Sequence, residues 1–313
     1  MKNSDEREAM FAEVLEGLNQ PQKALPSKYF YDEKGSKLFD EITELNEYYP
    51  TRTEWQILES KIGEIERYLG DDILLIEPGS GSSDKTRVLL DQVSGICCYI
   101  PIDISGDYLQ KVAGKLRRDY PSIQILPLQA DYTQSFKLPA SSPEARRVVF
   151  FPGSTIGNFK LETVQRFLKV ISEITGRDGA LLIGVDLKKD IEILEAAYND
   201  SKGITAAFNK NILHHINRVL DAGFEASLFE HKAFWDEGKS RIEMHLICQQ
   251  DHEVQINGTS ISFKKGETIH TENSHKYSLK DFEEIVSPWF TVKKVWMDEE
   301  KLFSVQFLEP AGD

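Results

Sequence analysis

The middle of the chain repeats one pattern, in which a short apolar run is followed by an amphipathic run. The apolar runs are DDILLIEPG (71–79), CCYIPIDIS (97–105), IQILPLQADYT (123–133), RRVVFFPGSTIGNF (146–159) and GALLIGVDLKKD (179–190). Helical patterns lie between them, as at residues 84–93 and 160–175. Apolar strands that alternate with helices are typical of a parallel sheet buried on both faces. We therefore predict an α/β fold.

The pattern changes near the C-terminus. Residues 279–290 have a helical pattern, and two strand patterns follow it at 291–297 and 302–309, joined by the polar turn DEEK (298–301). An antiparallel hairpin at the edge of a parallel sheet is a common ending for a mixed sheet. We expect this hairpin to close the sheet.

Two segments lack the strand–helix alternation. Residues 1–53 are mostly helical in pattern, and residues 191–276 begin with helices and continue with strands, including a hairpin signal at Asn257-Gly258. We predict that these segments form a second, inserted α+β domain. The expected division is a core of residues 54–190 and 277–313 and a second domain of residues 1–53 and 191–276.

The charge balance constrains the kind of partner. The chain has 313 residues, with 37 Lys and Arg against 51 Asp and Glu, and a formal net charge of −14. Nucleic-acid affinity depends largely on basic residues that neutralise phosphates, so this balance disfavours a nucleic acid and an anionic membrane surface. We expect a small-molecule ligand and a monomer.

Three cysteines (Cys97, Cys98 and Cys248) form no C-x-x-C pair and no disulfide framework, which favours a reducing compartment. The N-terminus shows no signal-peptide pattern, and no apolar run approaches the roughly 20 residues that span a bilayer. We therefore expect a cytoplasmic protein.

The turn GSGSSDKT (79–86) resembles a phosphate-binding loop without matching it. Gly79, Lys85 and Thr86 fit G-x-x-x-x-G-K-[ST], but Asp84 stands where the second glycine belongs and would place a negative charge beside the phosphates. The dinucleotide pattern G-x-G-x-x-G fails at the same residue. Two interpretations remain: a turn for a ligand with a sugar and an amino acid but no phosphate, or a tight strand-to-helix connection without a ligand.

Acidic residues end the first three predicted strands. They are Glu77, Asp103 and Asp131. Ligands of open α/β sheets bind at the carboxyl ends of the strands, and a carboxylate there can accept two hydrogen bonds from a ribose diol or one from an adenine amine. Acids without a basic phosphate clamp suit an adenosine ligand that bears a sulfonium, namely S-adenosyl-L-methionine (AdoMet). The alternative is that each acid only caps the helix that follows it.

Longer motifs give a more specific indication. The chain resembles the histidine Nα-methyltransferases of ergothioneine biosynthesis over nearly its whole length. The motifs that carry the resemblance are KYFYDEKGSKLFDEITELNEYYPTRTEWQIL (28–58), EPGSGSSDKTR (77–87), PIDIS (101–105), ADYT (130–133), FPGSTIGN (151–158), AAYNDSKGITAAFNKN (196–211), RIEMHL (241–246) and TENS (271–274). The resemblance implies a class I AdoMet-dependent methyltransferase core, which is Rossmann-like, with an inserted substrate-binding domain.

The family's functional residues transfer only to matching positions. For the cofactor, the resemblance implies Gly79, Lys85, Asp103, Asp131 and Tyr132. For the amino-acid substrate, it implies Tyr48, Asn158, Tyr198, Met244, Glu272 and Ser274. It makes Asn158 and Tyr198 the carboxylate grips and Glu272 and Ser274 the imidazole partners. Tyr31 and Tyr48 are the candidate catalytic residues, because tyrosine hydroxyls can relay the proton of the amine.

The implied reaction is the transfer of three methyl groups to the α-amine of L-histidine, which gives hercynine and three S-adenosylhomocysteines. The seven histidines show no i,i+4 ligand pair, so we expect no metal. Two competing functions stay open. One is a nucleotide-binding enzyme, on the strength of Lys85-Thr86 and a Walker-B-like LLIGVD (181–186). The other is a methyltransferase of the same family that acts on another amino acid or on a protein N-terminus.

Overall fold

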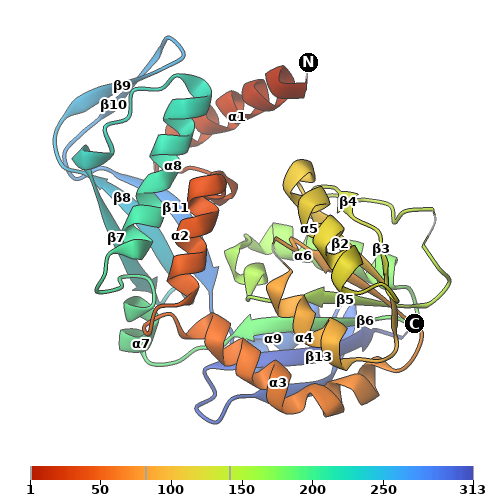
Figure 1. The fold of residues 1–313 in the computed structure, drawn as a ribbon. Coiled ribbons are helices and arrows are strands. Elements are labelled where there is room, and N and C mark those ends of the chain that lie inside the picture. The colour runs from red at the N-terminus through yellow and green to blue at the C-terminus, as the bar shows by residue number, and fades with distance from the viewer. Residues whose placement is uncertain (1, 82, 141, 313) are drawn as a thin grey trace. The chain divides into compact units, whose positions relative to one another are not determined.

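The computed structural model describes residues 2–81, 83–140 and 142–312, and the chain divides into two compact units. Unit 1 contains the chain up to Tyr49 and Lys189–His275. Unit 2 contains Pro50–Lys188 and the chain from Lys276 onward. Each unit therefore combines segments that are far apart in the sequence, as the colours of Figure 1 show.

Unit 2 is built on a mixed sheet whose strand order, over the described residues, is β12-β13-β6-β5-β1-β2-β3, with β4 also paired to β2. The strands are β1 (Ile73–Pro78), β2 (Ile96–Asp103), β3 (Gln124–Ile125), β4 (Leu128–Gln129), β5 (Arg146–Phe151), β6 (Ala180–Asp186), β12 (Phe290–Met297) and β13 (Phe303–Pro310). Strands β1 to β6 pair in parallel, β13 is antiparallel to β6, and β12 is antiparallel to β13. The predicted parallel sheet and its closing hairpin are confirmed.

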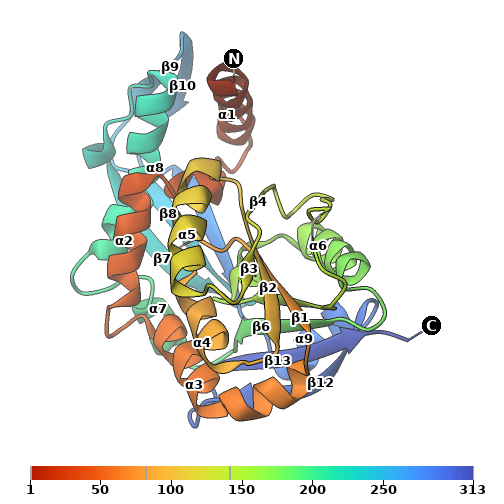
Figure 2. The ribbon, with the colours of Figure 1, turned by 45° about the vertical axis from the view of Figure 1, so that its right-hand side comes forward.

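Helices cover both faces of this sheet. One face packs against α3 (Tyr49–Leu69), α4 (Asp84–Gln92) and α5 (Gly106–Asp119), and the other against α6 (Leu161–Thr175) and α9 (Leu279–Val286) (Figure 2). Alternate residues of a strand point to opposite faces, so Leu75 of β1 joins the first core while Leu74 and Ile76 join the second. The uninterrupted apolar run of β1 follows from this double burial.

The third predicted strand is the one that differs from the expectation. Residues 123–133 form two two-residue strands, β3 and β4, that end at Gln129 rather than at Asp131. Pro127 separates them, and Pro101 lies between the residues of β2 that pair with each piece. Proline has no N–H for the ladder, so the two prolines interrupt the pairing.

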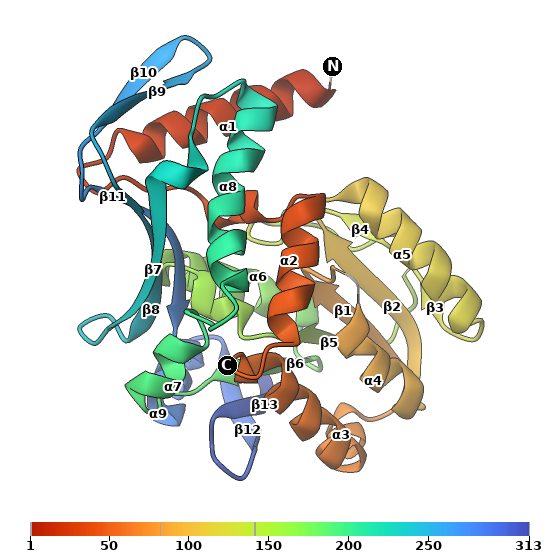
Figure 3. The same ribbon diagram turned by 60° about the vertical axis from the view of Figure 1, so that its left-hand side comes forward.

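Unit 1 contains a three-stranded antiparallel sheet in the order β11-β8-β7, with β7 (Phe229–Asp236), β8 (Arg241–Cys248) and β11 (Thr268–His275). Figure 3 shows α8 (Ile204–Leu220) running along this sheet. The other elements of the unit are α1 (Lys2–Leu18), η1 (Ser27–Phe30), α2 (Glu33–Thr43), α7 (Ile191–Ala196), η3 (Ala226–Leu228), β9 (His252–Ile256) and β10 (Thr259–Phe263).

The predicted hairpin at Asn257-Gly258 joins β9 to β10. Both turn residues have positive φ, +47° for Asn257 and +85° for Gly258. Among the helices of the described chain, none has the length and apolar character that crossing a lipid bilayer requires.

Candidate active site

The glycine turn after β1 is fixed to the end of β2. The backbone N–H groups of Gly79 and Ser80 donate to the carbonyl of Ile102, at 2.8 and 3.0 Å. Gly79 and Gly81 have φ of +70° and +49°, in the left-handed region that favours glycine. Ser82 and the side chain of Asp84 lie outside the described part of this turn.

Tyr132 packs directly over Gly79. A Cβ on Gly79 would lie 3.1 Å from Cε1 and 3.2 Å from the hydroxyl oxygen of Tyr132. The turn therefore needs glycine at this position for two reasons, its backbone conformation and the tyrosine ring above it. This contact brings together two of the residues that we predict for the cofactor.

The acids Asp103 and Asp131 lie at the same edge of the sheet. Asp103 accepts from the N–H of Ser105 at 2.8 Å and from the N–H of Gly81 at 3.4 Å, so it reaches the glycine turn. Asp131 accepts from the N–H and hydroxyl of Thr133, at 2.9 and 2.6 Å. Burial raises the pKa of Tyr132, and the negative charges of the two acids raise it further. Each acid thus accepts a hydrogen bond from a nearby backbone N–H, and both lie close enough to Tyr132 to raise its pKa.

We expect Gly79→Ala to destabilise the protein more than Gly81→Ala. Both substitutions place a side chain on left-handed backbone, which costs about 1–2 kcal/mol. A Cβ on Gly81 has no neighbour within 4 Å, whereas a Cβ on Gly79 must displace Tyr132. Urea unfolding of the two variants measures the difference, and equal destabilisation would contradict the packing role of Tyr132.

Lys85, at the start of α4, is held by a residue that the sequence analysis missed. Its ammonium forms an ion pair with Glu54, which is fully buried in α3. Both oxygens of Glu54 also accept from the N–H of Gly153 at 2.9 Å, and a Cβ on Gly184 would lie 1.9 Å from one of them. Glu54 therefore joins the helix after the glycine turn to the loop that carries Asn158.

The helical pattern contained a signal for Glu54. It precedes Ile57 and Leu58 by three and four residues, so it lies on the apolar face of its helix. A carboxylate on an apolar face must be buried with partners. The sequence could thus have marked Glu54 as unusual, although not named its partners.

Glu77 lies beneath the glycine turn and is almost fully buried. It accepts a hydrogen bond from the hydroxyl of Tyr99, which lies 2.9 Å from the hydroxyl of Ser83. Burial raises the pKa of Glu77 to about 7, against the opposing effect of its hydrogen bonds. Of the three acids predicted at strand ends, Glu77 is therefore the one that is buried, and its partner Tyr99 contacts Ser83 of the turn.

Asn158 lies in unit 2, in the short helix η2 (Thr155–Asn158), directly after the loop that contains Gly153 and Ser154. Ser154, just before it, has φ of +54°, and its hydroxyl accepts from the N–H of Asp186 at 2.9 Å. The loop is therefore fixed at Gly153 by Glu54 and at Ser154 by the end of β6.

The predicted tyrosines of unit 1 form a continuous chain of ring contacts. Tyr31 contacts Phe39, Phe39 contacts Tyr48, and Tyr48 contacts Tyr198, with ring centroids 5.8, 6.3 and 6.3 Å apart. All three contacts are edge-on, an arrangement that aromatic rings favour. Tyr31 is 45% exposed, whereas Tyr198 is buried, so the chain runs from the surface inward.

Tyr198 contacts strand β11 through a hydrogen bond. Its hydroxyl donates to the hydroxyl of Ser274 at 2.8 Å. Glu272 pairs with Met244 of the neighbouring strand and Ser274 with Ile242, so Glu272, Ser274 and Met244 occupy one face of the sheet. Asn273 pairs with Glu243 and belongs to the opposite face.

That opposite face holds the one group of described residues with the donor atoms and spacing for a metal, namely Glu243, His245 and His270. Glu243 already has charged partners, because it pairs with Arg241 and lies 3.1 Å from the ammonium of Lys239. Its other oxygen lies 2.9 Å from Nε2 of His245. These partners satisfy the carboxylate without a metal ion, so the absence of a metal stays our prediction.

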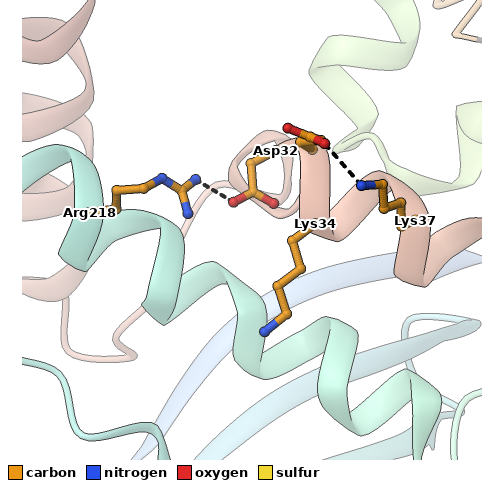
Figure 4. A pocket seen from close by; sticks show the side chains of 5 residues that line it. Asp32, Lys34, Lys37 and Arg218 are labelled. Atoms are coloured by element: carbon orange, nitrogen blue, oxygen red, sulfur yellow. Dashed lines mark hydrogen bonds and ion pairs between the residues drawn. The ribbon is translucent and has the colours of Figure 1, made fainter.

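A surface pocket of unit 1 is lined by Asp32, Glu33, Lys34, Lys37 and Arg218 (Figure 4). Arg218 pairs with Asp32 and Lys37 with Glu33, so most of its charges are neutralised within the pocket. None of the lining residues is one of the predicted site residues.

The chain is similar to proteins whose family is known. The family described as "Histidine-specific methyltransferase, SAM-dependent" matches residues 10–310. The histidine N-alpha-methyltransferase of Mycolicibacterium smegmatis is 41% identical over 276 residues, which cover 86% of this chain and 85% of that protein. The protein of the same name from Mycobacterium tuberculosis is 38% identical over 275 residues, covering 86% of this chain and 84% of its own.

Among solved structures, the chain is similar to a Burkholderia thailandensis 1,6-didemethyltoxoflavin-N1-methyltransferase with bound S-adenosylhomocysteine. The TM-score is 0.48 at 10% identity, over 94% of this chain and 93% of that chain. The family match covers both units, from α1 to the end of β13. The parallel sheet, its antiparallel ending and this match together place the chain in the histidine-specific, SAM-dependent methyltransferase family.

Proposed function

We propose that the protein transfers three methyl groups from AdoMet to the α-amine of L-histidine and forms hercynine, the first step of ergothioneine biosynthesis. The observation that supports histidine most directly is the hydroxyl pair of Tyr198 and Ser274, on the same face as Glu272. Hydroxyls and a carboxylate offer both acceptors and donors to a carboxylate and an imidazole ligand.

Each unit has a role in this proposal. Unit 2 binds AdoMet through Gly79, Lys85, Asp103, Asp131 and Tyr132. Unit 1 binds histidine through Tyr48, Tyr198, Met244, Glu272 and Ser274, and Asn158 stays a predicted contact of the substrate carboxylate. We further propose that the protein works as a cytoplasmic monomer on a small molecule, without a metal, nucleic acid or membrane partner.

Methyl transfer is an in-line displacement at the methyl carbon. The lone pair of the amine forms the new N–C bond while the C–S bond breaks, and its electrons remain on sulfur as the neutral thioether of S-adenosylhomocysteine. The reaction needs a neutral amine aimed at the methyl group, so positioning contributes most of the catalysis. An α-amine with a pKa of about 8 is mostly protonated at neutral pH, so a proton must leave before each transfer.

Three transfers convert an ammonium into a trimethylammonium and release three protons in total. Tyr31 and Tyr48 are the proposed relays for these protons, because a tyrosine hydroxyl can accept one proton and donate another. Ordered water must join the two hydroxyls, since the ring between them, Phe39, carries none. A relay passes the proton toward solvent, and the exposure of Tyr31 suits the outer end of such a path.

We expect the wild-type protein to accept histidine, its monomethyl form and its dimethyl form in turn. Time courses with saturating AdoMet, followed by mass spectrometry, should end at the trimethylated product. The same assay with each of the twenty amino acids tests the substrate. Reactions that stop at monomethylhistidine would contradict the hercynine assignment. Preferred methylation of another amino acid would favour the competing function, a methyltransferase of the same family with a different substrate.

A further inference from the structure

A β-bulge decides which side of the sheet Glu272 and Ser274 occupy. Strand β11 pairs His270 with His245 and then Glu272 with Met244, so Thr271 is an extra residue with no partner in the ladder. If the ladder had no bulge, Thr271 would pair with Met244 and Glu272 would lie opposite Glu243. A shift of one residue moves every following side chain to the other face of a strand. The bulge therefore keeps Glu272 and Ser274 on the face of Met244 and Tyr198.

One buried side chain holds this bulge. The hydroxyl of Thr271 lies 2.7 Å from Oδ1 of Asn209 in α8 and 3.0 Å from the carbonyl oxygen of Met244. Asn209 is fully buried, and its Nδ2 donates to the carbonyl of His245 at 3.1 Å. The bulge is thus tied both to its partner strand and to the helix that covers the sheet.

The side-chain amide of Asn209 also contacts His231 of β7, which in turn contacts Tyr198. Nδ2 of Asn209 lies 2.8 Å from Nδ1 of His231, and an amide nitrogen can only donate, so Nδ1 accepts. Nε2 of His231 then carries the proton and donates to the carbonyl of Tyr198 at 2.8 Å. Burial lowers the pKa of His231, in agreement with this neutral form.

We propose that Asn209 is a positioning residue for histidine recognition, which sets Glu272 and Ser274 through Thr271 and sets Tyr198 through His231. The proposal rests on the proposed function, because it takes these three residues as the contacts of the substrate. Asn209 does not itself touch the ligand in this assignment. It fixes the two sides of the pocket relative to each other through hydrogen bonds within unit 1.

The test compares Thr271→Val, which replaces the hydroxyl by a methyl group, with Thr271→Ser, which keeps the hydroxyl. Histidine binding to the S-adenosylhomocysteine-loaded protein is measured by calorimetry. Loss of one buried hydrogen bond predicts that Thr271→Val weakens histidine binding about fivefold to tenfold, while Thr271→Ser retains most of the affinity. The KM for histidine should rise with little change in kcat, because the ligand is still methylated once bound.

Two controls separate positioning from general damage. S-adenosylhomocysteine affinity should stay within twofold of wild type, and Thr259→Val in β10 should leave histidine binding unchanged. Asn209→Leu provides a second variant of similar volume, since it removes both the acceptor for Thr271 and the donor to His231, and it should also weaken histidine binding. Wild-type affinity in folded Thr271→Val or Asn209→Leu would overturn the inference alone. Wild-type protein that binds no histidine would overturn the proposed function and this inference together.

Discussion

Replacement of Asp103 by alanine is expected to weaken AdoMet binding by roughly 1.5–3 kcal/mol, the range for hydrogen bonds to a charged group. Asp103 ends β2 and reaches the glycine turn at the N–H of Gly81. A carboxylate in this position can accept hydrogen bonds from both ribose hydroxyls of the adenosine, whereas an alanine side chain can accept none. Titration calorimetry with AdoMet measures the loss.

Asp103 also accepts from the N–H of Ser105, so part of the effect of alanine could come from the backbone. Asp103→Asn keeps the shape and one acceptor and should lose less affinity. Asp107→Ala, which removes an acid from the first turn of the following helix α5, serves as the control. An Asp103→Ala protein that is folded and binds AdoMet like wild type would end the ribose assignment.

Replacement of Glu272 by alanine is expected to lower kcat/KM for histidine by at least about tenfold, which corresponds to roughly 1.4 kcal/mol. A neutral imidazole has one donor and one acceptor, and a charged one has two donors. A carboxylate beside the Ser274 hydroxyl can satisfy either state. An apolar side chain offers the carboxylate no hydrogen-bond donor, so the pocket should favour histidine over leucine and phenylalanine.

Asn273→Ala is the matched control, since Asn273 lies on the opposite face of the same strand. Adding Met244→Val to Glu272→Ala should admit a larger aromatic amino acid such as tryptophan, because Met244 pairs with Glu272 and forms the wall of the proposed pocket. Unchanged efficiency and selectivity for histidine in Glu272→Ala would rule out imidazole recognition by this residue.

The fold was largely predictable because its signals are local. The uninterrupted burial of β1 follows from helices on both faces, and the turn at Asn257-Gly258 follows from two residues that tolerate positive φ. The split of the third strand was not foreseen, although the sequence contains its cause. Pro127 removes one N–H, but its effect depends on Pro101 in the neighbouring strand, and that pairing is a long-range property.

The geometry of the candidate site follows only in part from local sequence patterns. The position of Asp103 at the end of a strand can be predicted from the alternation of strands and helices. Glu77 was predicted in the same way, but its side chain is buried. The partners of Glu54 lie in separate segments, at Lys85 and Gly153, and no local pattern joins them. The face of Glu272 depends on an extra residue at Thr271, which the sequence of a single strand cannot reveal.

The order of segments in unit 2 has a consequence for synthesis of the chain. Strand β6 pairs on one side with β5 and on the other with β13, and β13 is made only after residues 187–302. Until then β6 is an apolar strand with an open edge, which is a site for pairing with other chains. All of unit 1 between Lys189 and His275 must also be made before that edge can close. A truncation that spares every proposed binding residue but removes β12 and β13 would therefore produce an aggregation-prone chain rather than a smaller enzyme.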